Sequence, residues 1–308
     1  MQTTGHIFMV RPAFFGYNSE TAVNNAFQSP AADVSDMEET ARRAGDEFDR
    51  YVEMLRREGV SVEVRQDTAS PSTPDSIFPN NCFSTHLDYL ADGTASRSLV
   101  FYPMFARNRR EERPKIMAAR DSYFDRIIDL SGFEKDGLFL EGTGSLILDR
   151  ERHFAYACAS PRTDETVLEE WAEVLGYSYF LFDACDAHGT PVYHTNVMMH
   201  VGTSTAVVCI EAVRDSRQRI RLTDLLERSG KTIVPITLDQ MAHFAGNMLE
   251  LRSNDGRKLL VMSATAKASL TPEQLAVLGR DTTILAPELG AIEKAGGGSA
   301  RCMIAEIF

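Results

Sequence analysis

The longest regular pattern of apolar positions covers residues 38–58 and has the spacing of one helix face. Its apolar side chains are Phe48, Tyr51, Val52 and Leu55. Ser35 with Glu38 three residues later is typical of a helix start, and Gly59 is typical of a helix end. The alternating stretch 60–64 that follows predicts a strand.

Four further stretches predict helices. They are 114–130, a segment from Thr163 or Asp164 to Gly176, a segment that ends near Gly230, and 271–279 with Thr271 as cap and Pro272 in the first turn. Short apolar stretches at 177–182, 231–236 and 282–285 predict strands after the last three helices. This alternation of helices and short strands predicts an α/β fold.

Five short apolar segments, which we interpret as strands, each carry one polar or thiol residue. These marker residues are Asn81, Glu141, His194, Asn247 and Cys302. They recur at intervals of roughly 53 to 60 residues, which indicates a repeated unit of strands and one helix. The C-terminal strand would complete the first unit, so that five units close into a ring with the markers at its axis. The alternative is an ordinary α/β sandwich with coincidental spacing.

The composition narrows the classes of function. The 308 residues include 32 Lys and Arg against 44 Asp and Glu, a net charge of −12 that disfavours binding to nucleic acid or to an anionic membrane surface. Hydrophobic residues make up 44%, and no uncharged apolar run is long enough to span a membrane. Five cysteines without a CxxC pair indicate reduced thiols. We therefore expect a cytoplasmic protein that acts on small molecules.

Cys302 is the strongest candidate for chemistry. It follows the glycine run 296–298, which allows the backbone to approach a ligand closely, and the adjacent Arg301 would favour a thiolate. The alternative is a small buried thiol in a flexible terminal loop, because free cysteines are among the most buried residues.

His194 and Glu141 are candidate partners of this thiol. On a strand, His194 and Asn196 share a face, and a histidine near a cysteine can take up its proton and later protonate a leaving amine. Glu141 ends an apolar run and can orient a histidine or accept a substrate N–H. The alternatives are a structural histidine in the core and a carboxylate in a solvent-facing turn.

Other chemistries are poorly supported by the motifs. Cys82 with His86, or His194 with His200, lacks the spacing of a common zinc site. The glycines at 142 and 144 are not followed by the GK[ST] of a phosphate loop, and no GxSxG motif is present.

Two arginines precede helix starts, where loops often meet ligands. Arg107 and Arg162 could each form a forked pair with a substrate carboxylate. We expect Arg109, Arg110 and Arg113 to lie on a solvated face, although Arg109 or Arg110 could turn inward in place of Arg107.

Together these segments resemble the guanidine-group-modifying superfamily, the penteins. The similarity covers nearly the whole chain and rests on PDSIF at 74–78, the Glu141-Gly142 pair, SPRT at 160–163, His194 and GGGSARCM at 296–303. Within this superfamily the strings FPNNCFSTH and YHTN are most similar to the citrulline-utilisation hydrolases. The resemblance implies a five-bladed α/β propeller over residues 1–308 as a single domain, with neither metal nor organic cofactor.

The resemblance also implies roles for individual residues. Cys302 would be the nucleophile, His194 the general acid and base, and Glu141 their carboxylate partner. Asp75, Asn81, Asn196, Arg107 and Arg162 would contact an amino-acid substrate. The oligomeric state is left open, and a homo-oligomer is compatible with the sequence.

The departures from the superfamily pattern concern charge. Members that bind guanidinium typically have aspartates where this chain has Asn81 and Asn196, and the EGGD pattern becomes EGTG at 141–144. An asparagine offers one donor and one acceptor without charge, which suits a neutral ureido group. We therefore predict a hydrolase that converts citrulline to ornithine, carbon dioxide and ammonia. An arginine deiminase or methylarginine hydrolase of the same fold is the alternative, and a non-catalytic propeller that serves as a binding module is a second one.

Overall fold

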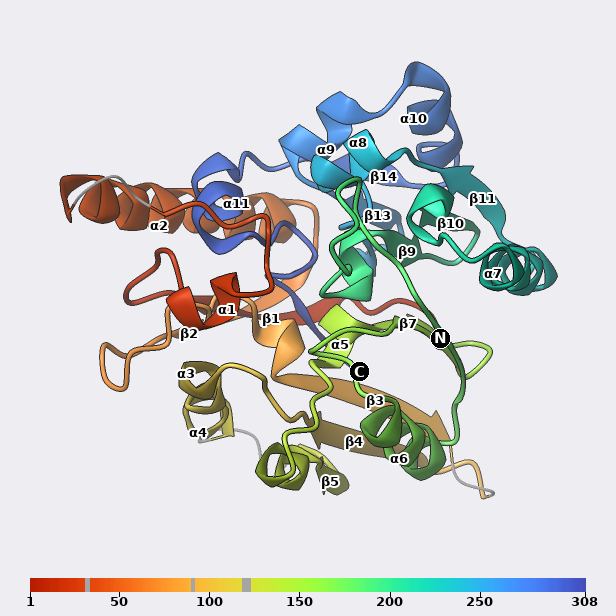
Figure 1. Cartoon of the computed structure of the whole chain (residues 1–308), viewed down its shortest axis with the longest axis horizontal. Helices are drawn as coiled ribbons and strands as arrows, with labels where there is room; N and C mark the ends of the chain where they lie inside the picture. The colour runs from red at the N-terminus through yellow and green to blue at the C-terminus, as the bar shows by residue number, and fades with distance from the viewer. Residues whose placement is uncertain (31–33, 90–91, 118–122) are drawn as a thin grey trace.

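The computed structural model describes residues 1–30, 34–89, 92–117 and 123–308. In these ranges the strands form five three-stranded sheets arranged around a common axis (Figure 1). In each sheet the middle strand pairs antiparallel with one neighbour and parallel with the other. This architecture is the five-bladed α/β propeller of the penteins, so the predicted fold class is confirmed.

Four blades follow one another along the chain and share one order of elements. Their strands are β3 (Phe83–Tyr89), β4 (Ala95–Phe101) and β5 (Arg126–Asp129); β6 (Leu146–Asp149), β7 (Phe154–Cys158) and β8 (Ser178–Phe182); β9 (Met199–Val201), β10 (Thr205–Val208) and β11 (Thr232–Pro235); and β12 (Leu249–Arg252), β13 (Lys258–Val261) and β14 (Thr283–Leu285). The crossovers to the third strands contain α3 (Arg107–Arg110) and α4 (Glu112–Met117), α6 (Glu165–Leu175), α7 (Ser216–Arg228), and α9 (Ala264–Ser269) with α10 (Pro272–Leu278).

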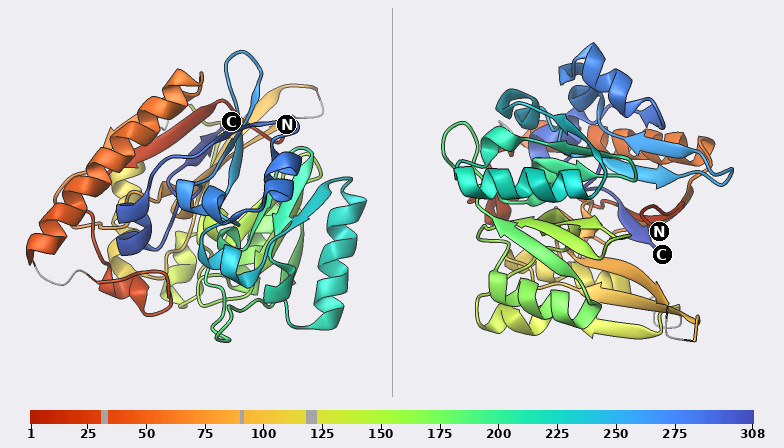
Figure 2. Two further views of the ribbon diagram at one scale, coloured as in Figure 1. Left: turned by 90° about the horizontal axis from the view of Figure 1, so that it is seen from above. Right: turned by 90° about the vertical axis from the view of Figure 1, so that its right-hand side faces the viewer.

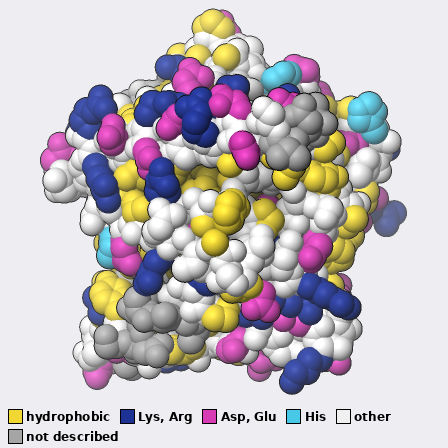
Figure 3. Space-filling view, turned by 90° about the vertical axis from the view of Figure 1, so that its left-hand side faces the viewer, with side chains coloured by type: hydrophobic (Ala, Val, Ile, Leu, Met, Phe, Trp, Pro, Cys, Tyr) yellow, Lys and Arg dark blue, Asp and Glu magenta, His cyan; other side chains and the backbone are white. Residues whose placement is uncertain are grey.

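The remaining blade joins the two ends of the chain. β15 (Ala305–Ile307) pairs antiparallel with β1 (His6–Arg11), which pairs in parallel with β2 (Ser61–Gln66) after the crossover helix α2 (Val34–Arg57). The termini therefore lie close together (Figure 2), and the space-filling outline has five lobes (Figure 3). This closure is the one that the marker spacing predicts.

The crossover helices lie at the periphery and bury the faces that the sequence pattern indicates (Figure 1). The predicted apolar face of α2 is buried at Phe48, Tyr51, Val52 and Leu55. α6 is capped by Asp164, whose side chain accepts the Thr166 N–H, and ends at Gly176 in the left-handed conformation. α10 begins after the cap Thr271, with Pro272 in its first turn. The predicted ends of α6 and α10 are confirmed.

The predicted helix 114–130 is wrong. α4 ends at Met117, and Arg126–Asp129 forms β5 instead. β5 pairs in parallel with β4, beginning with Arg126 opposite Ser98, so its backbone groups are satisfied by a neighbour that the local sequence does not reveal. Part of the predicted helix, residues 118–122, lies outside the described residues.

The interpretation of the marker segments as strands also needs correction. Three markers lie in or next to short helical turns, each directly before the first strand of a blade. These turns are η1 (Pro79–Asn81), α5 (Gly142–Ser145) and η3 (Thr195–Val197). The turns bring the chain into the axis before the strand leads it outward, so the markers meet although they do not lie on strands.

The other short helices are α1 (Ser19–Ala22), α8 (Leu238–Ala242), α11 (Gly290–Gly296), η2 (Ser131–Lys135) and η4 (Ile210–Ala212). None of the helices in the described part of the chain combines the length and apolar character that crossing a membrane requires.

Candidate active site

Polar side chains from all five blades gather at the axis, and we call this group the axial cluster. Its members are Asn81, Glu141, His194, Asn196, Asn247 and Cys302. All are buried, and Cys302 is the most exposed at 4%. Because buried polar groups are normally paired, the partners of each side chain indicate what the cluster can bind.

The Cys302 thiol faces amide groups. Asn247 Nδ2 lies 3.2 Å from Cys302 Sγ, and Asn196 Nδ2 lies 3.5 Å from it. Asn247 Oδ1 also accepts the Arg301 N–H at 3.0 Å, which fixes the amide next to the thiol. In the sequence, Asn247 is marked only by its spacing from the other axial residues, and that spacing was the signal for its place in the site.

The loop before Cys302 is held in place by tyrosines from distant elements. α11 ends at Gly297 with φ of +62°, a left-handed conformation that favours glycine. Tyr193 Oη donates to Gly297 O at 2.7 Å, and Tyr51 Oη donates to Ala300 O at 3.2 Å. The Arg301 guanidinium pairs with Glu306 at 3.3 Å and donates to Ile304 O at 3.0 Å.

Glu141 and His194 form a buried pair. His194 Nε2 donates to Glu141 Oε2 at 2.8 Å, and Arg162 Nη1 lies 3.4 Å from the same oxygen. Burial alone would raise the pKa of Glu141, but Arg162 and His194 outweigh it and hold the pKa well below its ordinary value. Burial lowers the pKa of His194 to about 4, although Glu141 opposes the shift. A neutral imidazole beside a carboxylate is the form that can accept a proton.

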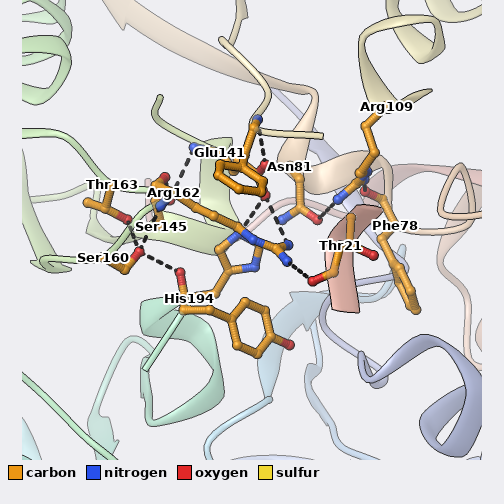
Figure 4. A network of polar contacts seen from close by, with 12 residues as sticks. Thr21, Phe78, Asn81, Arg109, Glu141, Ser145, Ser160, Arg162, Thr163 and His194 are labelled. Carbon is orange, nitrogen blue, oxygen red and sulfur yellow. Dashed lines mark hydrogen bonds and ion pairs between the residues drawn. The ribbon is translucent and has the colours of Figure 1, made fainter. Parts of the chain in front are cut away.

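Asn81 contacts a buried arginine that the sequence analysis expected at the surface. Arg109 Nη1 donates to Asn81 Oδ1 at 2.8 Å, and Arg109 forms a forked pair with Glu112 at 2.9 and 3.1 Å. Figure 4 shows Asn81 between Arg109 and the Glu141–His194 pair. The expectation that Arg109 is solvated is therefore wrong.

Arg107, by contrast, is exposed at the start of α3. Two positions along a helix turn a side chain by about 200°, so Arg107 and Arg109 point to opposite sides. The structure does not bring Arg107 to the axial cluster, and Arg109 takes the inward place instead.

Gly144 makes the close approach at the axis possible. A Cβ atom at this position would collide with Asn81 Nδ2 and would lie 2.8 Å from His194 Nδ1. The amide of Asn81 and the ring of His194 therefore both point toward the backbone of α5. The two glycines at 142 and 144 therefore allow the backbone of α5 to pack closely against Asn81 and His194.

A segment near the N-terminus reaches Arg162 and Asp75. Arg162 donates to Thr21 O at 2.7 Å and to Asn24 Oδ1 at 2.8 Å. Asp75 Oδ2 accepts from Asn18 Nδ2 and from Thr21 Oγ1, both at 2.9 Å. Burial raises the pKa of Asp75. Arg162 and Asp75, which the sequence predicts as substrate contacts, thus lie beside the axial cluster. In the structure both form hydrogen bonds with other residues of the protein.

Two polar atoms of the axial cluster have no hydrogen-bond partner within the described residues. They are Asn81 Nδ2, a donor, and Asn196 Oδ1, an acceptor. Asn196 Nδ2 is directed at Thr143 O and Cys302 Sγ, at 3.4 and 3.5 Å. Within the described residues, one donor and one acceptor of the axial cluster thus remain for a ligand. Across the described part of the chain, no group of three His, Cys, Asp or Glu side chains could hold a metal ion.

The five-bladed propeller is the fold of the guanidine-modifying penteins. The family model described as "N,N dimethylarginine dimethylhydrolase, eukaryotic" matches residues 11–308, so the chain belongs to this family of hydrolases. A search of the curated proteins finds no match.

Solved structures of the same fold resemble the whole chain. The substrate-bound N-terminal domain of ArgZ, a cyanobacterial arginine dihydrolase, has a TM-score of 0.74 and 16% identity, covering 98% of this chain and 97% of that chain. An AgrE complex with L-arginine has a TM-score of 0.73 and 16% identity, covering 98% of this chain and 40% of that chain. The citrulline complex of a DDAH from Pseudomonas aeruginosa has a TM-score of 0.63 and 15% identity, with full coverage of both chains. At such identities the likeness shows the fold alone.

Proposed function

We propose that this protein hydrolyses the ureido group of a free amino acid, with citrulline as the candidate substrate. The products would be ornithine, carbon dioxide and ammonia. One observation carries the proposal: the Cys302 thiol contacts the amides of Asn196 and Asn247, within an axial cluster that is rich in asparagine. Among the described residues, this cluster leaves one donor, Asn81 Nδ2, and one acceptor, Asn196 Oδ1, without a hydrogen-bond partner. A ureido group has a carbonyl acceptor and N–H donors, so it complements both atoms.

A guanidinium ion fits this arrangement less well. It carries only N–H donors and a positive charge, and the carboxylate of the axial cluster, Glu141, already pairs with His194 and Arg162. Arg109, beyond Asn81, is paired with Glu112, so that side offers no free counter-charge to a guanidinium. Because removing a cation from water without a counter-ion is costly, this site disfavours arginine relative to citrulline.

The reaction would proceed through a covalent adduct on Cys302. His194 accepts the thiol proton, and the sulfur adds to the ureido carbon to form a C–S bond. The carbon–nitrogen bond then breaks as His194 returns the proton to the departing amine. Water, deprotonated by His194, attacks the thiocarbamate and releases the thiol and a carbamate, which decomposes to carbon dioxide and an amine. Glu141 keeps the imidazole oriented throughout.

The remaining predicted contacts would hold the amino-acid end of the substrate. We assign Arg162 to the α-carboxylate and Asp75, whose Oδ1 has no partner among the described residues, to the α-ammonium. Arg162 would then exchange contacts with Thr21 and Asn24 for contacts with the substrate. The fold accommodates such ligands, since its relatives have been solved with citrulline and with arginine.

A second candidate is hydrolysis of N,N-dimethylarginine to citrulline and dimethylamine. The family description supports it directly, and the relatives named above favour a guanidine substrate over a ureido substrate. The same cysteine, histidine and glutamate would serve both reactions. The non-catalytic binding module is disfavoured, because the family is one of hydrolases.

Citrulline labelled with ¹³C at the ureido carbon would test the proposal. We expect labelled carbon dioxide together with ornithine and ammonia from the wild-type protein, and none from the Cys302→Ala variant. Acid quenching followed by mass spectrometry should show an adduct on the peptide that contains Cys302. A carbamoyl adduct would mean that ornithine leaves first, and an adduct that contains ornithine would mean that ammonia leaves first. Release of dimethylamine from dimethylarginine without any ornithine from citrulline would favour the second candidate instead.

A further inference from the structure

The amide of Asn81 has a defined orientation, because its partner can only donate. Arg109 Nη1 lies 2.8 Å from one end of this amide, and a guanidinium has no acceptor. That end must be the carbonyl oxygen. The Asn81 NH2 group is therefore the end that points toward the Gly144 backbone and the His194 ring.

Arg109 is itself held rigidly. Its side chain is 2% exposed and donates to both oxygens of Glu112, at 2.9 and 3.1 Å, and to Phe78 O at 2.9 Å. Glu112 is equally buried and neutralises the guanidinium. With donors committed on several sides, Arg109 cannot rotate to release the Asn81 oxygen without breaking a buried ion pair, which is strongly unfavourable.

The resulting polarity matches one substrate class. Asn81 presents N–H donors, and Asn196 presents its unpaired oxygen because its own NH2 group is directed at Thr143 O and Cys302. A ureido group can accept from Asn81 through its oxygen and donate to Asn196 through its nitrogen. A guanidinium group would place an N–H against the NH2 group of Asn81.

We propose that Arg109, clamped by Glu112, is a specificity-determining positioning residue that fixes the Asn81 amide with its donors toward the substrate. This inference rests on the proposed function. Arg109 touches no reacting atom; it acts through Asn81. It selects a neutral ureido substrate because a free asparagine amide could otherwise flip to offer its oxygen to a guanidinium.

The test compares kcat/KM for citrulline with kcat/KM for arginine in matched variants. Arg109→Met with Glu112→Leu removes the clamp without leaving an unpaired buried charge, and such apolar replacements of buried ion pairs often keep the fold. We expect the citrulline-to-arginine ratio to fall at least about tenfold, because Asn81 can then offer either end. Arg109→Lys, which also can only donate, should keep the ratio close to that of the wild type even if both rates fall.

The matched control is the neighbouring pair Arg113 and Glu134, which is joined at 2.6 and 2.9 Å but does not contact Asn81. Arg113→Met with Glu134→Leu should leave the ratio unchanged. If the Arg109→Met, Glu112→Leu double variant (the clamp variant) does not fold, Asn81→Asp provides an isosteric alternative. There Arg109 would hold one carboxylate oxygen and the other would face the substrate, so the ratio should fall about a hundredfold.

An unchanged ratio in a folded clamp variant would overturn the role of Arg109 while leaving the proposed function intact. If Asn81→Asp has the same citrulline-to-arginine ratio of kcat/KM as the wild type, the proposed role of Arg109 is also overturned. A wild-type protein with no preference for citrulline is a different outcome, and it would contradict the proposed function itself.

Discussion

Two groups of buried side chains around Cys302 differ in electrical character. The charged group consists of Glu141, His194 and Arg162, which are linked by contacts of 2.8 and 3.4 Å. The amide group consists of Asn81, Asn196 and Asn247, of which the last two point at the sulfur. Except for Arg162, which follows β7, the members of both groups lie on segments that precede the first strands of the blades, so the fold alone does not distinguish them.

The difference separates two tasks. The members of the charged group pair with one another through His194 Nε2 and Arg162 Nη1, and the histidine is neutral, which suits proton transfer with any substrate. The amide group leaves one donor and one acceptor unpaired, which suits recognition. We infer that the charged group supports the chemistry and the amide group selects the substrate, and the predictions below separate these contributions.

The largest effect is expected from the nucleophile. Cys302→Ala should lower kcat by at least about a thousandfold for every substrate, because no covalent adduct can form. Steady-state rates with citrulline and dimethylarginine measure this, and circular dichroism checks the fold. Retention of more than about a hundredth of the activity would show that Cys302 is not the nucleophile.

The next largest effect is expected from reversing the polarity of the amide group. The double variant Asn81→Asp and Asn196→Asp should shift the ratio of kcat/KM for citrulline to that for arginine by about a hundredfold toward arginine. Asn254→Asp, which adds a charge at an exposed site, is the control. If the double variant lowers both rates equally, the amide group does not select the substrate.

The charged group should also make the stability of the protein depend on pH. The pKa of His194 is lowered from its ordinary 6.5 to about 4, so the folded state binds this proton less readily than the unfolded chain. The stabilisation is complete above pH 6.5 and is lost as pH falls toward 4, by about 3 kcal/mol for this residue. Urea unfolding at pH 7, 5 and 4 measures it. His194→Gln should flatten the profile, whereas Asn81→Ser should shift it equally at every pH; parallel profiles for wild type and His194→Gln would refute the claim.

A smaller effect is expected at the edge of the charged group. Arg162→Lys keeps the charge but loses the fork, so KM for citrulline should rise about tenfold, with a smaller fall in kcat because Arg162 also contacts Glu141. Initial rates over a range of citrulline concentrations separate the two constants. An unchanged KM would remove Arg162 from substrate binding.

The fold could be predicted largely from the spacing of a few residues. The intervals between Asn81, Glu141, His194, Asn247 and Cys302 indicate five units, and β15 closes the ring as that periodicity requires. Local signals also sufficed for α6, where Asp164 and Gly176 mark both ends. The prediction of a helix at 114–130 was wrong because β5 forms only through its pairing with β4, which no local pattern encodes.

The site was harder to predict because it depends on how turns are oriented in space. The sequence identified His194 and Asn196 by a strand argument, whereas both residues lie at a 3-10 turn and reach different partners. Arg107 and Arg109 are two residues apart, and only the rotation of α3 decides which of them faces the axis. Asn247 carried a spacing signal, but its contact with the thiol depends on the packing of two neighbouring blades.

We propose that the asparagine amides of the axial cluster select a neutral substrate. The most direct measurement is kcat/KM of the wild-type protein for citrulline, arginine and N,N-dimethylarginine, side by side at one pH. We predict that citrulline exceeds both guanidine substrates by at least about a hundredfold, because only its ureido group complements the unpaired atoms of Asn81 and Asn196. Equal or faster turnover of arginine or dimethylarginine would contradict this account and favour the guanidine hydrolase.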